Sequence, residues 1–240
     1  MPVNLGQVFP DFDCVTTQGN FKLLSYLAGS WGILFSHPAD FTPVCTTELG
    51  MAAAMKPEFD KRQVKMLGLS IDSVKSHNDW MKVDYNSSSI TIYRHCLNLV
   101  ILQDIQSYSK LEGAFPYPII AGDRKLALDL GMLDPDELDA TGMPLTARCV
   151  FIIGPDQKLK LSLLYPATTG RNFNEIIRVI DSLQLTANKK VATPANWKSG
   201  EKCMVIPSLS DAQAKDLFPK GFETTQVPSG KCYIRLTPDP

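Results

Sequence analysis

The sequence predicts an α/β domain, in which a central mixed sheet is flanked by helices, with a small domain appended at its C-terminal end. Short apolar segments alternate with segments rich in helix-forming residues, the order that builds a sheet covered by helices. Hydrophobic residues make up 44% of the 240 residues, enough for one sizeable core. After Leu185 the composition becomes polar and rich in proline, which separates the C-terminal part.

The first predicted elements are a hairpin and a buried strand. Apolar residues between Val8 and Val15 precede a turn at Gln18 to Asn20, and a second apolar stretch runs from Phe21 to Leu27. Trp31 to Phe35 then has the length and composition of a short core strand.

A helix is predicted to begin at about Thr42. Threonine is a good N-cap, Pro43 stands where a missing backbone N–H costs nothing, and Glu48 to Met55 is rich in helix formers. Pro57 is expected to kink or end this helix.

The remaining predicted elements of the first domain are a strand, a helix, two strands joined by a turn, and a last helix whose apolar residues recur at helical spacing. They span Val64 to Ile71, Ser73 to Val83, Ala147 to Ile153, Leu159 to Leu163 after a turn at Gly154 to Gln157, and the stretch from Asn172 to Leu185. The β-α-β-α order indicates parallel strands in the core of the sheet. Followed by a hairpin and a helix, it is the plan of the thioredoxin-like fold.

We place the first domain at residues 1–185 and the second at residues 186–240. The second part has only short apolar runs, so we expect it to pack on the first domain or on another subunit rather than to fold alone.

Charge and hydropathy exclude several classes of function. Lys plus Arg number 24 and Asp plus Glu 25, so we expect no surface for nucleic acid or for an acidic membrane. No apolar run approaches the roughly 18 residues of a membrane-spanning helix. The first ten residues lack the basic and apolar parts of an export signal. We therefore expect a soluble, cytoplasmic protein without integral membrane association.

The six cysteines stand at positions 14, 45, 96, 149, 203 and 232, with irregular spacing and no C-x-x-C. In a reducing compartment they are expected to be free thiols. Cys45 differs because the predicted helix places it in the first turn, where unpaired N–H groups and the helix dipole favour a thiolate. Position alone leaves two interpretations open, an activated nucleophile and a buried thiol.

Residues 38–45 match the pattern P-x-x-x-T-x-x-C, a signature of the peroxiredoxins. The chain resembles the one-cysteine branch of that family over nearly its whole length, except for one internal segment. The other stretches that carry the resemblance are Trp31 to Pro38, Thr46 to Leu49, Gly142 to Arg148, Tyr165 to Phe173 and Phe218 to Gly221.

The resemblance implies a thiol-dependent peroxidase, an antioxidant enzyme that reduces hydrogen peroxide and alkyl or lipid hydroperoxides. Cys45 would be the peroxidatic thiolate, and its attack on the nearer peroxide oxygen would leave a sulfenic acid. By the same motifs, Thr42 would orient the peroxide, and Arg148 would favour the thiolate and hold the polarised oxygens. Pro38 would shield the pocket from water.

Three residues are assigned supporting roles. His37 lies where the branch also has a histidine near the thiol, and a purely structural role is the equal alternative. Arg171 is expected to brace the pocket, with a contact to a helix terminus as the alternative. Glu48 is expected to be a charge partner, for instance of an arginine, rather than a general base. No bound cofactor is implied, and His77 and His95 show no metal-ligand spacing, so no metal site is expected.

Thr193 stands where two-cysteine peroxiredoxins are expected to carry their resolving cysteine, within Val191 to Trp197. The resemblance therefore implies that an external thiol, such as glutathione or another small or protein thiol, reduces the sulfenic acid. In the family the C-terminal domain mediates a homodimer, and we expect the same here.

A second activity, a phospholipase, is often credited to this branch and needs G-x-S-x-G, a preceding histidine and a distant aspartate. Here Ala28 replaces the first glycine before Ser30, and Leu24 occupies the place of the histidine, although Asp156 remains. Nothing then activates Ser30, so a serine phospholipase is the weaker alternative.

The segment Tyr85 to Asp104 has no counterpart in the resemblance. Its removal would join Val83-Asp84 to Ile105-Gln106 and restore a family-like length. A genuine insertion and a translated intron or gene-model error are both open, and the clean joint favours the second.

A third class of function also stays open, a thioredoxin-fold chaperone or a variant whose catalysis this segment impairs.

Overall fold

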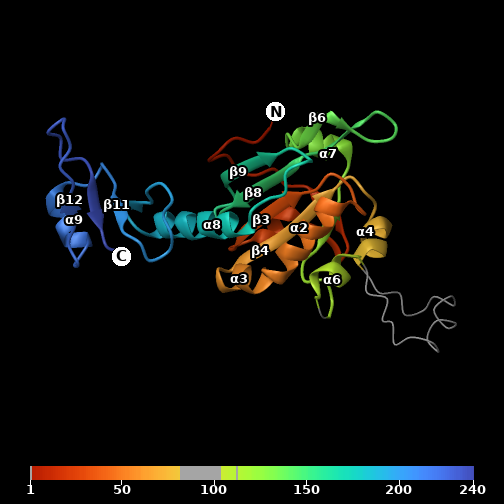
Figure 1. Ribbon diagram of the computed structural model, residues 1–240, viewed down its shortest axis with the longest axis horizontal. Helices are drawn as coiled ribbons and strands as arrows, with labels where there is room; N and C mark the ends of the chain where they lie inside the picture. Colours follow the sequence, from red (N-terminus) through yellow and green to blue (C-terminus); the bar gives the residue numbers. More distant parts are fainter. Residues whose placement is uncertain (1, 82–103, 112) are drawn as a thin grey trace. The chain divides into compact units, whose positions relative to one another are not determined.

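The fold is described from a computed structural model of the chain (Figure 1). The structure describes residues 2–81, 104–111 and 113–240. The predicted segment 85–104, with His95 and Cys96, lies outside the described residues apart from Asp104. The chain forms two compact units, Met1–Phe173 and Asn174–Pro240, which are described separately.

The first unit is built on a seven-stranded mixed sheet with the order β2-β1-β5-β4-β3-β8-β9. The central strands β3, β4 and β5 are mutually parallel, whereas the outer pairings are antiparallel. The mixed sheet predicted from the sequence is therefore confirmed. The strands are β1 (Asp13–Thr16), β2 (Gly19–Lys22), β3 (Trp31–Ser36), β4 (Val64–Ser70), β5 (Ile119–Ala121), β8 (Arg148–Ile153) and β9 (Leu159–Tyr165).

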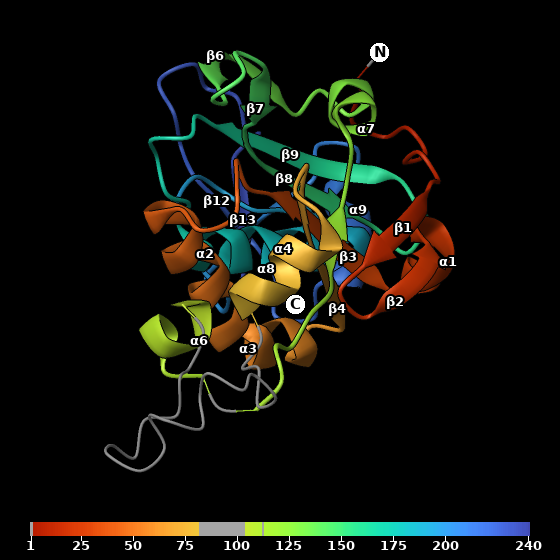
Figure 2. The ribbon, with the colours of Figure 1, turned by 90° about the vertical axis from the view of Figure 1, so that its right-hand side faces the viewer.

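Helices cover both faces of this sheet. In Figure 2, α2, α4 and α6 lie on one side of the central strands, and α1 and α7 lie on the other. Pro57 ends one helix and begins the next, as predicted, because it occupies the second position of α3. The helices are α1 (Leu23–Leu27), α2 (Pro43–Ala54), α3 (Lys56–Lys61), α4 (Val74–Met81), α6 (Asp104–Ser109) and α7 (Arg124–Asp129).

Side chains of β8 alternate between the two faces. Cys149, Phe151 and Ile153 belong to the apolar cluster that also contains residues of α1 and α7. Because neighbouring strand residues point to opposite faces, Arg148 points toward α2. This alternation brings a cationic side chain to the helix that carries Cys45.

One prediction for the first unit was wrong, and one stretch of the chain had no prediction. Leu23–Leu27 forms the short helix α1 rather than the end of a hairpin strand, so the hairpin is limited to β1 and β2. The chain from Ile105 to Thr146, for which no element was predicted, contains α6, β5, α7 and a separate hairpin of β6 (Leu133–Leu138) and β7 (Pro144–Thr146).

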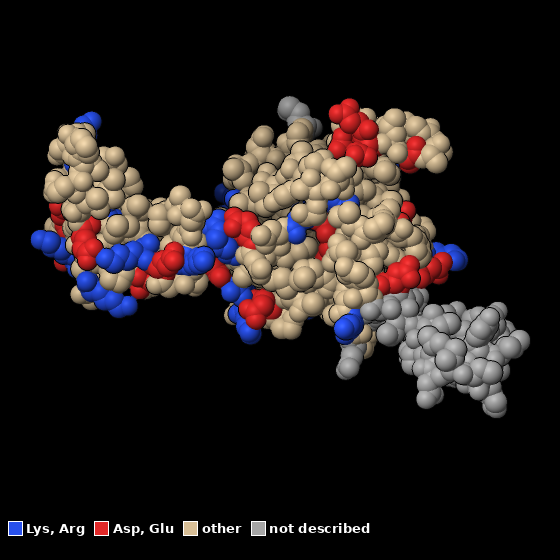
Figure 3. All heavy atoms as spheres, in the orientation of Figure 1, with Lys and Arg blue, Asp and Glu red and all other residues tan. Residues whose placement is uncertain are grey.

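Acidic side chains gather over β6 (Figure 3).

The second unit has a small core of its own. It contains α8 (Phe173–Asn188), α9 (Asp211–Leu217) and a four-stranded antiparallel sheet with the order β10-β11-β13-β12. These strands are β10 (Val191–Ala192), β11 (Cys203–Val205), β12 (Glu223–Thr224) and β13 (Arg235–Thr237). Trp197, Phe218 and Leu185 pack in its apolar cluster.

The boundary between the units lies at the start of α8, whereas the sequence placed it after Leu185. The contacts of the helix explain the difference. Leu185 packs in the second cluster, Arg178 donates to the carbonyl of Trp197, and the hydroxyls of Ser182 and Thr193 are 2.6 Å apart. Among the described residues, no helix is long and apolar enough to cross a bilayer.

Candidate active site

Cys45 lies in the first turn of α2, as the sequence predicted. Thr42 is the N-cap, but its hydroxyl donates to the carbonyl of Ala39 at 3.0 Å rather than capping the helix. The first helical hydrogen bond runs from the N–H of Thr46 to the carbonyl of Thr42. Pro43 has no N–H, and the N–H groups of Val44 and Cys45 have no acceptor within the helix. The positive end of α2 is thus directed at the thiol.

Arg148 lies beside this thiol. Its Nη1 is 3.3 Å from Cys45 Sγ, and both side chains are buried. The Nε and Nη2 atoms both donate to the carbonyl of Ala167, at 2.8 and 2.6 Å. This carbonyl fixes the plane of the guanidinium, so that Nη1 remains for Cys45 and for Glu48.

Glu48 joins two arginines one turn further along α2. Its Oε2 accepts from Nη1 of Arg148 and Nη2 of Arg171, each at 2.7 Å, and its Oε1 accepts from the N–H and Nε of Arg171. Burial by itself would raise the pKa of Glu48. The charges and hydrogen bonds of Arg171, followed by the charge of Arg148, outweigh it and lower that pKa. The structure thus brings together Glu48 and both arginines assigned from the sequence.

The charges around Cys45 do not cancel. Two guanidinium groups face one carboxylate in a region closed to solvent, so one positive charge is left without an anionic partner within this group. A negative sulfur on Cys45 would balance it. Arg171 also lies against the ring of Phe35, with Cζ 5.4 Å from the ring centroid, which fixes the second guanidinium.

Three other buried thiols among the described residues have raised pKa values. Burial, with help from Asp11 and Asp13, raises the pKa of Cys14 to about 12. Burial also raises the pKa of Cys149 to about 11, and that of Cys203 above its usual value. Cys232 is exposed. Cys45, in contrast, accepts a hydrogen bond from a guanidinium.

Pro38 and His37 come from the loop that joins β3 to α2, and both are buried. His37 was expected either to support the thiol by a hydrogen bond or to have a purely structural role. In the described part of the chain, its Nε2 pairs with Asp40 Oδ1 at 2.9 Å, and the hydrogen bonds include none from His37 to Cys45. Burial, partly offset by the hydrogen bond and charge of Asp40, lowers the pKa of His37.

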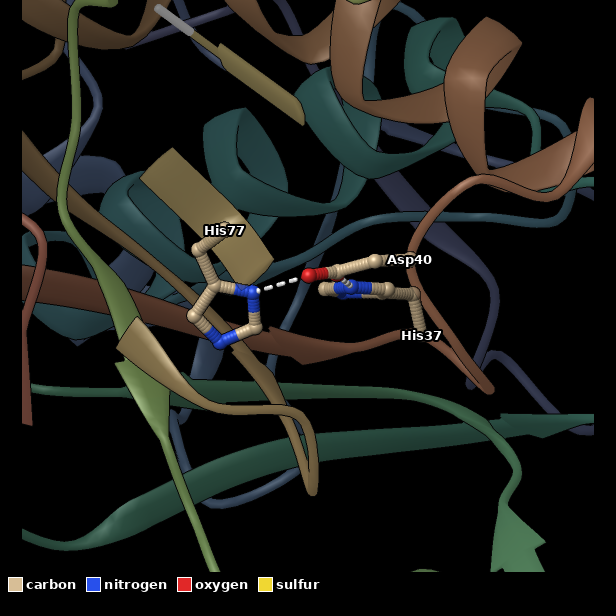
Figure 4. A group of neighbouring side chains, drawn as sticks. All are labelled: His37, Asp40 and His77. Carbon is tan, nitrogen blue, oxygen red and sulfur yellow. Dashed lines mark hydrogen bonds and ion pairs between the residues drawn. The ribbon is translucent and has the colours of Figure 1, made fainter. Parts of the chain in front are cut away.

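Asp40 links His37 to a second histidine, His77 of α4 (Figure 4). Its Oδ2 lies 2.7 Å from His77 Nδ1 and accepts from the Ser76 hydroxyl at 2.8 Å. Burial would raise the pKa of Asp40, but the hydrogen bonds from the two histidines outweigh it and hold that pKa well below its usual range. Asp40 is therefore an anion flanked by two imidazoles.

This group has the composition of a metal site, because the possible ligand atoms of His37, Asp40 and His77 lie within 4.8 Å of one another. Its geometry favours a hydrogen-bonded cluster instead. The ring nitrogens nearest Asp40 already pair with the carboxylate. The opposite ring nitrogens, His37 Nδ1 and His77 Nε2, have no partner among the described residues, whereas a metal-binding histidine almost always donates its second N–H. The absence of a metal site, expected from the sequence, stays a prediction.

The patterns in the sequence did not point to Asp40, to its pairing with His77, or to the carbonyl of Ala167. A backbone carbonyl leaves no trace in residue types. Asp40, however, lies inside the P-x-x-x-T-x-x-C motif and three residues after a histidine, a spacing that permits a local pair. His77 is far from both in sequence, and only the packing of α4 brings it to them.

The residues weighed for a serine hydrolase do not form a nucleophile and base. Leu24, which replaces the histidine, packs against the apolar cluster formed by β8, α1 and α7, here called the cluster of the α1 face. Asp156 pairs with Lys160 at 2.6 Å. The alternative therefore gains no support from the geometry.

Comparisons with known proteins decide the family. The profile of the AhpC/TSA family matches residues 5–162, and that of the C-terminal domain of 1-Cys peroxiredoxin matches residues 182–221. The chain belongs to the peroxiredoxin family. It is 58% identical to peroxiredoxin-6 of Gallus gallus and 54% identical to that of Homo sapiens, in each case over 98% of this chain and 97% of the relative. Peroxiredoxins are thiol-dependent peroxidases, so the chain is assigned to the oxidoreductases.

Solved structures agree with this assignment. A crystal structure of a cysteine-to-serine mutant of peroxiredoxin 6 from Arenicola marina matches with a TM-score of 0.88 and 54% identity, covering 99% of both chains. A yeast mitochondrial 1-Cys peroxiredoxin matches with a TM-score of 0.80 and 38% identity, covering 98% of this chain and 99% of that one. These neighbours confirm the thioredoxin-like fold with a C-terminal domain.

Proposed function

We propose that Cys45 is the peroxidatic thiol of this peroxiredoxin and that it reduces hydrogen peroxide and alkyl or lipid hydroperoxides. The observation that carries the proposal is the hydrogen bond from Arg148 Nη1 to Cys45 Sγ in the first turn of α2. The N-terminal end of α2 and the guanidinium of Arg148 together favour the anionic form of the sulfur, which is the form that attacks the peroxide.

The reaction follows from these groups. The thiolate attacks the nearer peroxide oxygen, an S–O bond forms as the O–O bond breaks, and the departing oxygen takes up a proton to leave as water or an alcohol. Negative charge moves from sulfur to that oxygen during the step. Arg148 can stabilise this charge as it moves, because Nη1 is held at the sulfur while the carbonyl of Ala167 fixes the rest of the guanidinium. Thr42 and Pro38 lie on the loop that leads into α2, where they would orient the peroxide and exclude water.

The product of this step is a sulfenic acid on Cys45. One external thiol converts it to a mixed disulfide with release of water, and a second thiol releases Cys45 and leaves as a disulfide. Glutathione or another small or protein thiol is the reductant we propose. The yeast mitochondrial 1-Cys peroxiredoxin supports this class of reductant, since thiol resolution in that protein proceeds via glutathione and thioredoxin systems. The cytoplasm, where such thiols stay reduced, is the compartment we propose, and a homodimer is the proposed assembly.

The test is peroxide consumption by the purified protein with glutathione, compared with a Cys45→Ser variant. We expect turnover by the unsubstituted chain and none above background by the variant. Equal consumption by both proteins, or none by either, would reject Cys45 as the peroxidatic thiol and favour the non-catalytic alternative. Ester hydrolysis with a Ser30→Ala control tests the phospholipase alternative in the same preparations, and we expect none.

A further inference from the structure

The loop that precedes the helix of Cys45 has an unfavourable backbone conformation. Phe41 has φ of +54°, in the left-handed region that bulky side chains rarely adopt. Phe41 is 55% exposed, so burial offsets little of this strain. The ring lies near Trp80 of α4, with centroids 5.9 Å apart. A residue in such a conformation persists only where its surroundings impose it.

The constraint acts on the residue before Phe41. The carboxylate of Asp40 is bound by His37, His77 and Ser76, and its backbone N–H donates to Asp72 Oδ2 at 3.0 Å. Two of these side chains come from α4. Asp72 follows β4 and accepts in addition from the hydroxyl of Ser70. Asp40 is thereby tied on both sides to elements outside its own loop.

The residue after Phe41 is Thr42, whose hydroxyl is held by the carbonyl of Ala39. Four consecutive residues, from Ala39 to Thr42, thus form a turn with its strain at Phe41 and its anchor at Asp40. Pro38 lies directly before this turn. Any relaxation of Phe41 would displace the Thr42 hydroxyl and Pro38 relative to Cys45, whereas the contacts of Arg148 come from β8 and would stay.

We propose that His77 is a positioning residue for peroxide reduction, which through Asp40 holds residues 37–42 in the strained conformation that places Thr42 and Pro38 at the thiol. The inference rests on the proposed role of Cys45. His77 suits this role because it is fully buried and gives Asp40 an N–H donor that the carboxylate cannot replace with water.

The first experiment measures the second-order rate of Cys45 oxidation by hydrogen peroxide in His77→Leu and His77→Asn. Leucine removes the donor, whereas the asparagine side chain can place an N–H where Nδ1 of His77 stands. For leucine we expect the rate to fall by at least about tenfold, because displacing a reacting group by about 1 Å can lower a rate by up to roughly a hundredfold. For asparagine we expect most of the rate to return. Lys75→Ala, an exposed change on the same helix, is the matched control.

The same variants carry a second readout that separates positioning from general damage. Alkylation of Cys45 by iodoacetamide at pH 7 needs the thiolate but not the Thr42 hydroxyl, so it should stay within about twofold of the unsubstituted rate. Should His77→Leu fail to fold, Ser76→Ala removes a weaker donor of the same carboxylate and should lower the oxidation rate by a smaller factor. Equal losses in alkylation and in oxidation, or no loss in oxidation, would overturn the proposal.

The strain itself can be tested with Phe41→Asn, because asparagine tolerates the left-handed conformation far better than phenylalanine does. In this background the loop needs its anchor less, so His77→Leu should cost several times less in rate than it does beside Phe41. An identical loss in both backgrounds would show that His77 does not act through the strained turn. If the unsubstituted chain itself does not react with peroxide, the proposed role of Cys45 fails rather than the role of His77.

Discussion

At the scale of single residues, one buried guanidinium at the candidate site has three partners. Arg148 contacts the thiol, the Glu48 carboxylate and the Ala167 carbonyl. The charge alone could be supplied by a lysine, but the planar arrangement of donors could not. The two variants Arg148→Lys and Arg148→Met therefore separate charge from geometry.

We predict that Arg148→Met slows oxidation of Cys45 by about 100-fold to 1,000-fold, in line with the loss of a donor that stabilises a developing anion. Arg148→Lys should fall between this variant and the unsubstituted chain. Stopped-flow fluorescence after mixing with peroxide measures both rates. A methionine variant within about threefold of the unsubstituted rate, under about 1 kcal/mol of barrier, would remove Arg148 from the mechanism.

Glu48 links the site to the acid stability of the fold. Its pKa is lowered in the folded state, so the ionised carboxylate adds stability above its unfolded pKa of about 4.3, and this stability is lost as the pH falls through the folded value. Asp40 shifts in the same direction. We predict that Glu48→Gln lowers the free energy of unfolding by about 3 kcal/mol at pH 7, because two buried arginines lose their counter-ion.

The same variant should also flatten the pH dependence. Urea denaturation between pH 7 and pH 3 would show a shallower decline below pH 4.3 for Glu48→Gln than for the unsubstituted chain. Parallel curves would mean that Glu48 does not contribute through its charge. Glu58→Gln is the matched control, since that carboxylate is an exposed partner of Lys61 and Arg62.

At the scale of elements, a glycine on α2 permits the close approach of α6. A Cβ added to Gly50 would overlap Ser109 Oγ and lie 2.8 Å from Ser109 Cβ. We predict that Gly50→Ala destabilises the protein by about 1–3 kcal/mol through overpacking, although alanine is the better helix former by about 1 kcal/mol. Adding Ser109→Gly should recover part of this loss. Urea denaturation measures the free energy of unfolding. If Gly50→Ala alone is more stable than the unsubstituted chain, the contact between α2 and α6 has room for the added methyl group.

The elements near Cys45 could be predicted because the residues that determine them are local. Thr42, Pro43 and Pro57 mark the ends of α2 and α3 without reference to the rest of the chain. The hairpin of β8 and β9 follows from alternation and a turn. Strand β5, with three residues, is too short to show a period, and it is defined by its pairing with β4 and β1.

The residues of the candidate site also include some that a local pattern predicts and some that only the folded chain brings together. Cys45 and Thr42 follow from a short motif, and Arg148 from the resemblance. The His37–Asp40–His77 cluster requires α4 to pack against the loop before α2, a tertiary contact that no spacing in the sequence encodes. The core of the second unit was also underestimated, since its apolar residues are scattered from Leu185 to Phe222 and come together only in the folded sheet.

At the scale of the whole molecule, the positions of the thiols determine how the catalytic cycle ends. Cys14 and Cys149 lie in strands β1 and β8 within the apolar cluster of the α1 face, and Cys203 is in the core of the second unit. Thr193 occupies the position expected for a resolving cysteine, and its hydroxyl pairs with Ser182. Of the described thiols outside the site, Cys232 is exposed to solvent.

We predict that one equivalent of peroxide leaves Cys45 as a sulfenic acid that persists, without a disulfide to another cysteine. A disulfide needs Cα atoms within roughly 7 Å and a thiol free to approach, and Cys14 and Cys149 could move only by breaking their strands. Intact mass should rise by about 16 Da and a dimedone adduct should form, whereas excess peroxide should give about 32 Da, the sulfinic acid. Cys232→Ser is the decisive companion variant, because it removes the exposed thiol and should leave both masses unchanged. A loss of two hydrogens with a peptide linking Cys45 to Cys232, absent in that variant, would make Cys232 a resolving thiol and end the one-cysteine assignment.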